Sequence, residues 1–259
     1  MNLKGTASNT LRAIGLTPLV DRVRYTLMRR KNQEANAAFV ANHPEVKLPP
    51  DYLMYESFRL DYQKYFYGGK ETAAWLVDLI LKHTVAPEPG FSILDWGCGP
   101  GRVVRHLQDL LPIAAVVHGT DYNPATIAWC KQALPTISFN HNELAAKLPY
   151  PDGTFDAIYG ISIFTHLSEA LHHDWIHELR RVLKPGGLLL LTMQGNNFKA
   201  KLSPSELSAF ERGELVVRGS VKEGHRTYSA FHPDAYLQNL FQDFTVLEQI
   251  IIDGRGKDY

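Results

Sequence analysis

The feature that most constrains this chain is an acidic residue with three glycines, which directly follow a short apolar run. Phe91–Leu94 is largely apolar, Asp95 follows it, and glycines stand at the alternate positions 97, 99 and 101. Apolar residues at helical spacing come next, from Val103 to Leu111. Glycine lets a backbone adopt positive φ and approach a ligand closely, and a following helix directs unpaired N–H groups at that ligand. The stretch therefore predicts the first strand–turn–helix unit of a nucleotide-binding α/β fold.

The spacing of the glycines separates two kinds of nucleotide-binding protein. A dinucleotide fingerprint, G-x-G-x-x-G, would need its third glycine at position 102, where this chain has Arg102. The pattern D-x-G-x-G-x-G instead resembles motif I of the class I S-adenosylmethionine-dependent methyltransferases. An NAD-type oxidoreductase remains the alternative.

Two later stretches extend the resemblance in the expected order. Leu148–Asp156 resembles the family's "LPF-x-DGSFD" run, in which we interpret Asp156 as structural, and Arg181–Gly187 reads RVLKPGG, a family hallmark. The resemblance covers about residues 91 to 195. It implies an α/β fold with a doubly wound, mostly parallel sheet of the seven-stranded, Rossmann-like type. Residues 70–259 would form the methyltransferase domain, with a substrate-side insertion at about 196–232, and residues 1–69 would form an N-terminal helical extension or lid.

Apolar patterns and turn residues predict the elements of this domain. We expect Gly68-Gly69 to end an aromatic helix that contains Tyr65 and Tyr67, and we expect these four residues to lie in the lid. The remaining predicted strands are Ala114–His118, Ile137–Phe139, Ala157–Gly160, an all-apolar strand through Leu188–Leu191 that should be buried on both faces, and Phe244–Ile252.

The cofactor that the resemblance implies is S-adenosylmethionine. Asp121 at the tip of the second strand would bind the ribose hydroxyls, as an acid does in nucleotide-binding folds; the alternative is a helix N-cap. The other positions that match the family's cofactor site are Asp95, Gly97, Cys98, Gly99, Gly101 and Arg102 for the methionine part, Tyr122, Asn142 and Glu143 for the adenine, and Gly160, Ile161 and Ser162 for the crevice wall.

The predicted function is methyl transfer to an oxygen or nitrogen of a small-molecule acceptor. A non-catalytic protein that binds S-adenosylmethionine is a further alternative. His166 is the candidate general base, because imidazole titrates near neutrality, although it could instead form a structural hydrogen bond. Aromatic and histidine side chains near the C-terminus would contact the acceptor or pack: Phe198, His225, Tyr228, Phe231 and His232.

Composition and spacing argue against other classes. Lys+Arg and Asp+Glu both number 27, so no nucleic-acid partner is expected. No metal site is expected either, because His173 and His177 point away from Trp175, which we take to lie on the buried face of their helix. Two cysteines fit a reducing compartment, and no apolar run spans a bilayer, so we expect a cytoplasmic protein.

The N-terminal residues 1–31 form a basic amphipathic segment. Seven basic residues accompany the single acid Asp21, and Leu16, Leu19, Val20, Val23 and Leu27 recur at helical spacing. We favour a helix that packs on the domain with a solvated charged face. Weak contact with a membrane surface is the alternative, because basic amphipathic helices bind anionic lipid.

Overall fold

A computed structural model describes residues 17–84, 88–112 and 114–251 of the chain. The chain divides into two compact units. The first, here called the sheet unit, comprises Leu19–Gly160 and Arg181–Leu190; the second, the C-terminal unit, consists mainly of Ile161–Arg180 and residues 191–251. Part of the predicted basic segment, residues 1–16, lies outside the described residues.

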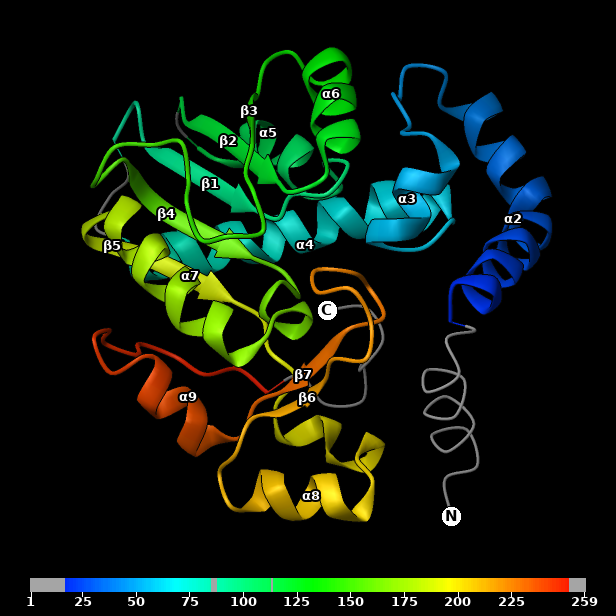
Figure 1. Cartoon of the computed structure of the whole chain (residues 1–259). Helices are drawn as coiled ribbons and strands as arrows, with labels where there is room; N and C mark the ends of the chain where they lie inside the picture. Colours follow the sequence, from blue (N-terminus) through cyan, green and yellow to red (C-terminus); the bar gives the residue numbers. More distant parts are fainter. Residues whose placement is uncertain (1–16, 85–87, 113, 252–259) are drawn as a thin grey trace. The chain divides into compact units, whose positions relative to one another are not determined.

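The sheet unit is built on five strands in the order β3-β2-β1-β4-β5 (Figure 1). They are β1 (Ser92–Trp96), β2 (Val116–Asp121), β3 (Ser138–His141), β4 (Phe155–Gly160) and β5 (Leu183–Leu191). β2 and β4 both pair in parallel with β1, and β3 pairs in parallel with β2. The parallel α/β fold is confirmed, with five of the seven expected strands in the described part of the chain.

The central strands are buried and the outer strand is not. Every residue of β1 is buried, as expected of a strand covered on both faces. β5 begins at Leu183, before the Pro-Gly-Gly turn, and its apolar residues 187–191 are only half-buried. The prediction that this strand is buried on both faces is therefore wrong, because β5 lies at the edge of the five-stranded sheet.

Asp156 ties three strands together at the opposite end of the sheet from the glycine turn. Its Oδ2 accepts hydrogen bonds from Ser92 N at 2.8 Å and from Lys184 Nζ at 2.7 Å. These residues belong to β4, β1 and β5. The structural interpretation of Asp156 is confirmed.

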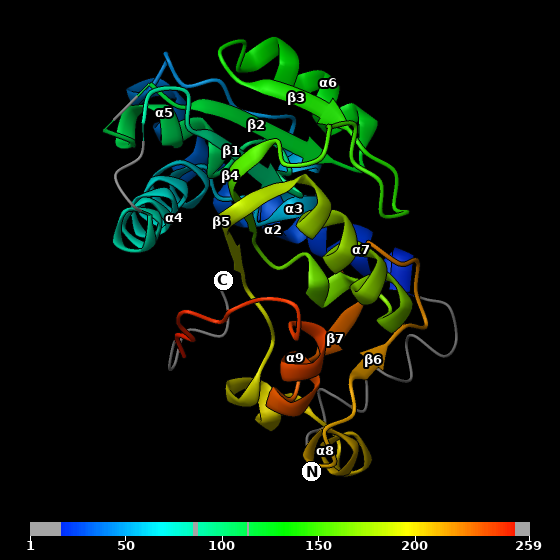
Figure 2. The ribbon, with the colours of Figure 1, turned by 90° about the vertical axis from the view of Figure 1, so that its left-hand side faces the viewer.

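Helices accompany the strands of this unit (Figure 2). They are α2 (Thr17–Asn42), α3 (Asp51–Ser57), α4 (Tyr62–His83), the short α5 (Leu107–Leu110) and α6 (Pro124–Ala133). The helix predicted from Val103 onward is shorter than expected, because a 3-10 turn, Val104–His106, precedes α5. α4 packs against α5, and α6 packs against β2 and β3.

The predicted break at Gly68-Gly69 is wrong, because α4 continues through both glycines to His83. Packing explains why a glycine occupies position 69. A Cβ there would lie 2.1 Å from the backbone oxygen of Arg102, in the turn after β1. The glycine at position 69 thus lets α4 lie close to the loop after β1; it does not end the helix.

Gly69→Ala should therefore destabilise the protein while Gly68→Ala should not. The added methyl group at 69 meets backbone that cannot move aside, which should cost about 3 kcal/mol, the upper end of typical overpacking, or roughly 5–10 °C in Tm. A Cβ at position 68 meets nothing within 4 Å. That control should leave Tm unchanged or slightly raised, as alanine favours helix. Equal Tm values for the two variants would contradict the assigned contact.

The C-terminal unit contains short elements. They are the 3-10 turn η2 (Phe164–His166), α7 (Glu169–Val182, which ends in the sheet unit), the 3-10 turn η3 (Asn196–Lys201), α8 (Pro204–Glu211), the antiparallel pair β6 (Val216–Arg218) and β7 (Ser229–Phe231), and α9 (Asp234–Leu240). Phe198, Phe210, Val216 and Phe231 form its buried apolar cluster. Phe198 and Phe231 are thus packing residues.

The strand predicted at Phe244–Ile252 is wrong for the residues described. Residues 245–251 form neither helix nor strand, and Val246, Leu247, Ile250 and Ile251 are exposed. An apolar run forms a strand only where a neighbouring strand supplies backbone partners, and no pairing is made along these residues. Across the described ranges, no helix is long and apolar enough to cross a membrane.

Candidate functional site

The turn after β1 adopts a conformation that requires glycine. Gly97, Gly99 and Gly101 have φ values of 76°, 50° and 78°, all in the left-handed region. Gly97 N and Cys98 N both donate to Thr120 O at 2.8 Å, which fixes the turn to the end of β2. The turn is therefore a shaped cradle of backbone, as its sequence predicts.

Asp121 reaches into this turn from the end of β2. Its Oδ2 accepts a hydrogen bond from Gly99 N at 3.0 Å, and its Oδ1 accepts one from Asn123 N at 2.8 Å. Burial raises the pKa of Asp121 to about 6, although these two N–H groups oppose the rise. The N-cap of α6 is Asn123, whose side chain accepts from Ala125 N and Thr126 N. The alternative role of Asp121 as that cap is thereby excluded.

Asp95 is a second buried carboxyl near the turn. Burial raises its pKa to about 7; Tyr159 and Arg102 lower it, and the nearby Asp121 raises it further. Tyr159 is its register partner on β4. A buried carboxylate in this setting favours a cationic partner, such as the ammonium group of an amino acid.

Asn142 offers an unused acceptor beside Asp121. Asn142 N donates to Asp121 O at 3.2 Å and its Nδ2 donates to Glu143 O at 2.8 Å. Its buried Oδ1 has no hydrogen-bond partner among the described residues. Such an orphaned acceptor fits the exocyclic amine of adenine. Glu143 is exposed, so Asn142 is the better candidate of the two.

The end of α3 covers the glycine turn, which the sequence did not indicate. A Cβ on Gly99 would lie 3.1 Å from Cβ of Ser57. Asn123 Nδ2 donates to Glu56 Oε2 at 3.4 Å, and the Arg102 guanidinium lies 4.5 Å from the ring centre of Phe58. Only the aromatic spacing of this segment was visible in the sequence.

Two of the four residues predicted for the lid contact the same turn. Tyr65 donates from its hydroxyl to Pro100 O at 2.5 Å, and Gly69 packs on Arg102. Tyr67 instead bonds to His43 Nε2 at 3.0 Å, and a Cβ added to Gly68 would meet no atom within 4 Å.

The predicted cofactor residues fall into both units. The sheet unit holds Asp95, Gly97, Cys98, Gly99, Gly101, Arg102, Asp121, Tyr122, Asn142, Glu143 and Gly160, and the C-terminal unit holds Ile161, Ser162 and His166. Tyr122 is partly exposed, and its backbone oxygen contacts His141 Nε2 at 3.0 Å. Ser162 has a φ of 59°, and its N–H donates to Thr192 Oγ1 at 2.8 Å.

His166 is held in one tautomer within the C-terminal unit. Its Nδ1 lies 2.8 Å from the backbone oxygen of Tyr228, so Nδ1 carries the proton and donates it. Gly224 N donates to the backbone oxygen of His166 at 2.9 Å. Burial lowers the pKa of His166, so the ring is neutral at pH 7 and Nε2 keeps its lone pair. The ring is therefore equipped to accept a proton.

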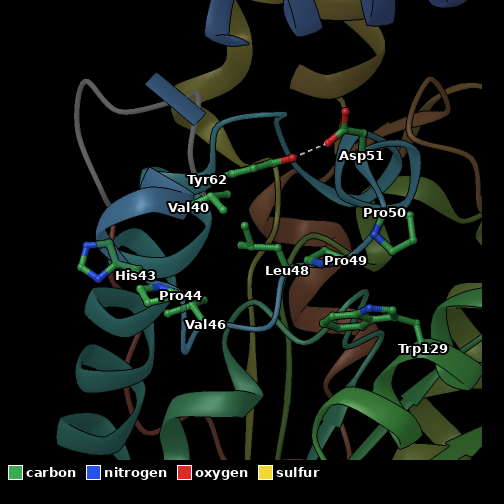
Figure 3. Close-up of a pocket in the computed structure, with 10 residues that line it drawn as sticks. All are labelled: Val40, His43, Pro44, Val46, Leu48, Pro49, Pro50, Asp51, Tyr62 and Trp129. Carbon is green, nitrogen blue, oxygen red and sulfur yellow. Dashed lines mark hydrogen bonds between the residues drawn. The ribbon is translucent and has the colours of Figure 1, made fainter. Parts of the chain in front are cut away.

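A separate hollow of about 520 Å³ opens in the sheet unit (Figure 3). Its walls are mainly apolar and include Val46, Leu48, Pro49 and Trp129, and Tyr62 donates to Asp51 Oδ1 at 2.6 Å at its edge. No predicted cofactor residue lines it. This hollow is thus distinct from the glycine turn.

Comparison with known proteins finds relatives of the segment that contains the glycine turn. The model of a methyltransferase domain matches residues 93–187. A probable S-adenosylmethionine-dependent methyltransferase of Mycolicibacterium smegmatis is 33% identical over 151 residues, which cover 55% of this chain and 56% of that protein. A trans-aconitate 2-methyltransferase of Variovorax paradoxus is 34% identical over 117 residues, covering 45% of this chain and 43% of that protein.

A solved structure is also similar. The crystal structure of a TehB-like SAM-dependent methyltransferase from Corynebacterium glutamicum covers 56% of this chain and 73% of its own at 25% identity, with a TM-score of 0.41. The chain spans about half the length of the two curated relatives above. The matched segment contains β1, the glycine turn, Asp121, β4 and the first part of β5. Residues 93–187 of this chain are therefore similar to the methyltransferase domains of known S-adenosylmethionine-dependent methyltransferases.

Proposed function

We propose that this chain binds S-adenosylmethionine at the glycine turn and transfers its methyl group to an oxygen or nitrogen of a small-molecule acceptor. The observation that carries the binding proposal is the hydrogen bond from Gly99 N to Asp121 Oδ2. It brings a carboxylate against a left-handed glycine backbone, and the orphaned Oδ1 of Asn142 lies directly after the next strand, β3.

Each group has a role that follows from its chemistry. Asp121 would accept hydrogen bonds from the ribose hydroxyls, Asp95 would pair with the ammonium group, and Asn142 Oδ1 would accept from the adenine amine. Tyr122 would lie against the adenine ring. The bound cofactor supplies a methyl group on a positively charged sulfur. The protein then mainly positions the acceptor.

His166 is proposed as the general base that takes a proton from the acceptor. Its neutral ring presents Nε2 as an acceptor, while Tyr228 O holds the protonated Nδ1. Such a base is needed only for an acceptor whose reacting atom loses a proton. The names of relatives do not select the acceptor atom, because a sterol 24-C-methyltransferase of Gibberella zeae, 32% identical over 114 residues, is among them.

The first experiment separates binding from turnover. Calorimetric titration with S-adenosylmethionine and then with NAD should give a binding isotherm for the first alone. Incubation with S-adenosylmethionine and a panel of carboxylic acids, phenols, sugars and amines should release S-adenosylhomocysteine with at least one acceptor. Binding of NAD in place of S-adenosylmethionine would overturn the proposal, and binding without any turnover would support a non-catalytic role.

Affinity for S-adenosylmethionine should fall as the pH is lowered from 8 to 5.5. The pKa values of Asp95 and Asp121 are raised to about 7 and about 6, so both carboxyls gain protons across this interval. A protonated Asp95 no longer attracts the ammonium group, and each unit of pH below a pKa weakens binding to the ionised form up to about tenfold. We expect a total loss of at least about tenfold, measured as Kd at each pH. A constant Kd would exclude both carboxyls from the binding site.

A further inference from the structure

We propose that the outward face of the first half of α2 is a docking surface for anionic membranes. The proposal is independent of methyl transfer. It rests on which face of this helix packs on the sheet unit and which face is left exposed.

The packed face of α2 is not the apolar face that the sequence indicated. Tyr25 contacts the rings of Tyr52 and Tyr55 at 5.7 and 5.3 Å. Asn32 Nδ2 donates to Leu60 O at 2.7 Å, and Phe39 is buried. α2 thus packs on the sheet unit and carries a solvated charged face, as the favoured interpretation states, but aliphatic residues accompany the charges on that outward face.

The aliphatic residues of that helix form an exposed stripe. Leu19, Val23 and Leu27 have exposed fractions of 60%, 52% and 60%. They are spaced four residues apart, so each lies about 40° around the helix from the one before. We call these three residues the α2 stripe. Figure 1 shows α2 with α3 beside it.

The charged residues of α2 beside the stripe are basic. Arg22, Arg24, Arg30 and Lys31 are exposed, and their spacing puts them on both sides of the stripe and one turn beyond it. Arg29 is also exposed, but it forms an ion pair with Asp51 Oδ2 of α3 at 3.1 Å and is not counted with them. Asp21, the one acid in this part, turns inward and accepts a hydrogen bond from Tyr55 Oη at 2.9 Å. The next acid on the outward face is Glu34. An apolar stripe between cationic side chains is the pattern of helices that lie in the plane of a membrane interface.

Charge favours a membrane over a second copy of the chain. A symmetric dimer through the stripe would bring the same cationic residues of two copies together. An anionic membrane instead attracts each of them, at about fivefold in affinity for each basic residue near the surface. The stripe would then enter the boundary between headgroups and acyl chains.

The test is sedimentation of the full chain with phosphatidylcholine vesicles that contain or lack phosphatidylglycerol. We expect binding to the anionic vesicles, weaker binding at high salt, and little binding to pure phosphatidylcholine. The double variant Val23→Ser/Leu27→Ser should bind anionic vesicles at least about tenfold more weakly, because it removes two of the three aliphatic side chains that would enter the membrane. Both positions are exposed, and circular dichroism will verify that the fold is kept.

The chain provides a matched control. Val246 and Leu247 are the same pair of residue types with exposed fractions of 64% and 58%. Val246→Ser/Leu247→Ser should bind vesicles within about twofold of the unmodified chain. Arg22→Glu/Arg30→Glu should abolish the preference for anionic lipid.

Several outcomes would overturn the proposal. These are absence of binding to anionic vesicles, equal binding to neutral ones, or full binding by Val23→Ser/Leu27→Ser. A dimer in light scattering that becomes a monomer in this variant would assign the stripe to a second copy. If the chain bound an acidic protein but no anionic vesicles, the stripe would be assigned to an acidic protein partner.

Discussion

Asp121→Asn should weaken the binding of S-adenosylmethionine about 100-fold, or roughly 2.7 kcal/mol. The carboxylate accepts from Gly99 N and Asn123 N with different oxygens. An amide keeps one acceptor and directs an NH2 group at the other N–H donor. The variant thus loses the charge that would bind the ribose hydroxyls and disturbs the turn itself. Calorimetric titration measures the change in Kd.

A matched substitution isolates the effect of this one carboxylate. Asp109 is exposed on α5 in the same unit, and Asp109→Asn makes the same chemical change. Its Kd should remain within about twofold of the unmodified value, as for most surface substitutions. A Kd for Asp121→Asn within about threefold of the unmodified chain would place the ribose elsewhere. Melting temperatures of both variants will separate lost binding from lost folding.

The position of Asp121 could be predicted because it depends on chain topology. The glycine turn follows β1 and Asp121 ends β2, and the carboxyl ends of neighbouring parallel strands lie at one edge of a sheet. The glycine pattern and the expected strand order were therefore sufficient to predict that the turn and Asp121 lie close together. The tautomer of His166 was not predictable in this way, because it depends on Tyr228, which lies far along the chain.

The parts that could not be predicted depend on tertiary contacts. Gly69 reads locally as a helix breaker, yet its role is set by the backbone of Arg102. The cover formed by Glu56, Ser57 and Phe58 likewise depends on where α3 docks.

Apolar periodicity likewise does not predict tertiary contacts. It identified the α2 stripe and the run through Val246 and Leu247, but it does not say what covers an apolar residue. In both places the described structure leaves those side chains exposed. Tyr25, on the opposite face of α2, makes ring contacts with Tyr52 and Tyr55 instead.

His166→Asn should lower kcat about 100- to 1000-fold and leave the Kd of S-adenosylmethionine unchanged. The asparagine NH2 group can take the place of Nδ1–H and keep the hydrogen bond to Tyr228 O. The substitution therefore preserves the contact that holds the loop and removes Nε2, the proposed base. Loss of a general base typically costs this much in rate. The measurement is release of S-adenosylhomocysteine with an acceptor found in the panel, under saturating cofactor.

The pH dependence of the rate distinguishes a base from a structural residue. Burial lowers the pKa of His166, so the neutral, proton-accepting form persists below pH 6.5. For the unmodified chain, kcat should fall only as the pH drops through this lowered pKa, and His166→Asn should lose that limb of the profile. His177→Asn, at an exposed position on α7, should keep both the rate and the limb. A rate for His166→Asn within about threefold of the unmodified chain would show that His166 serves the loop through Tyr228 and that the acceptor loses its proton by another route.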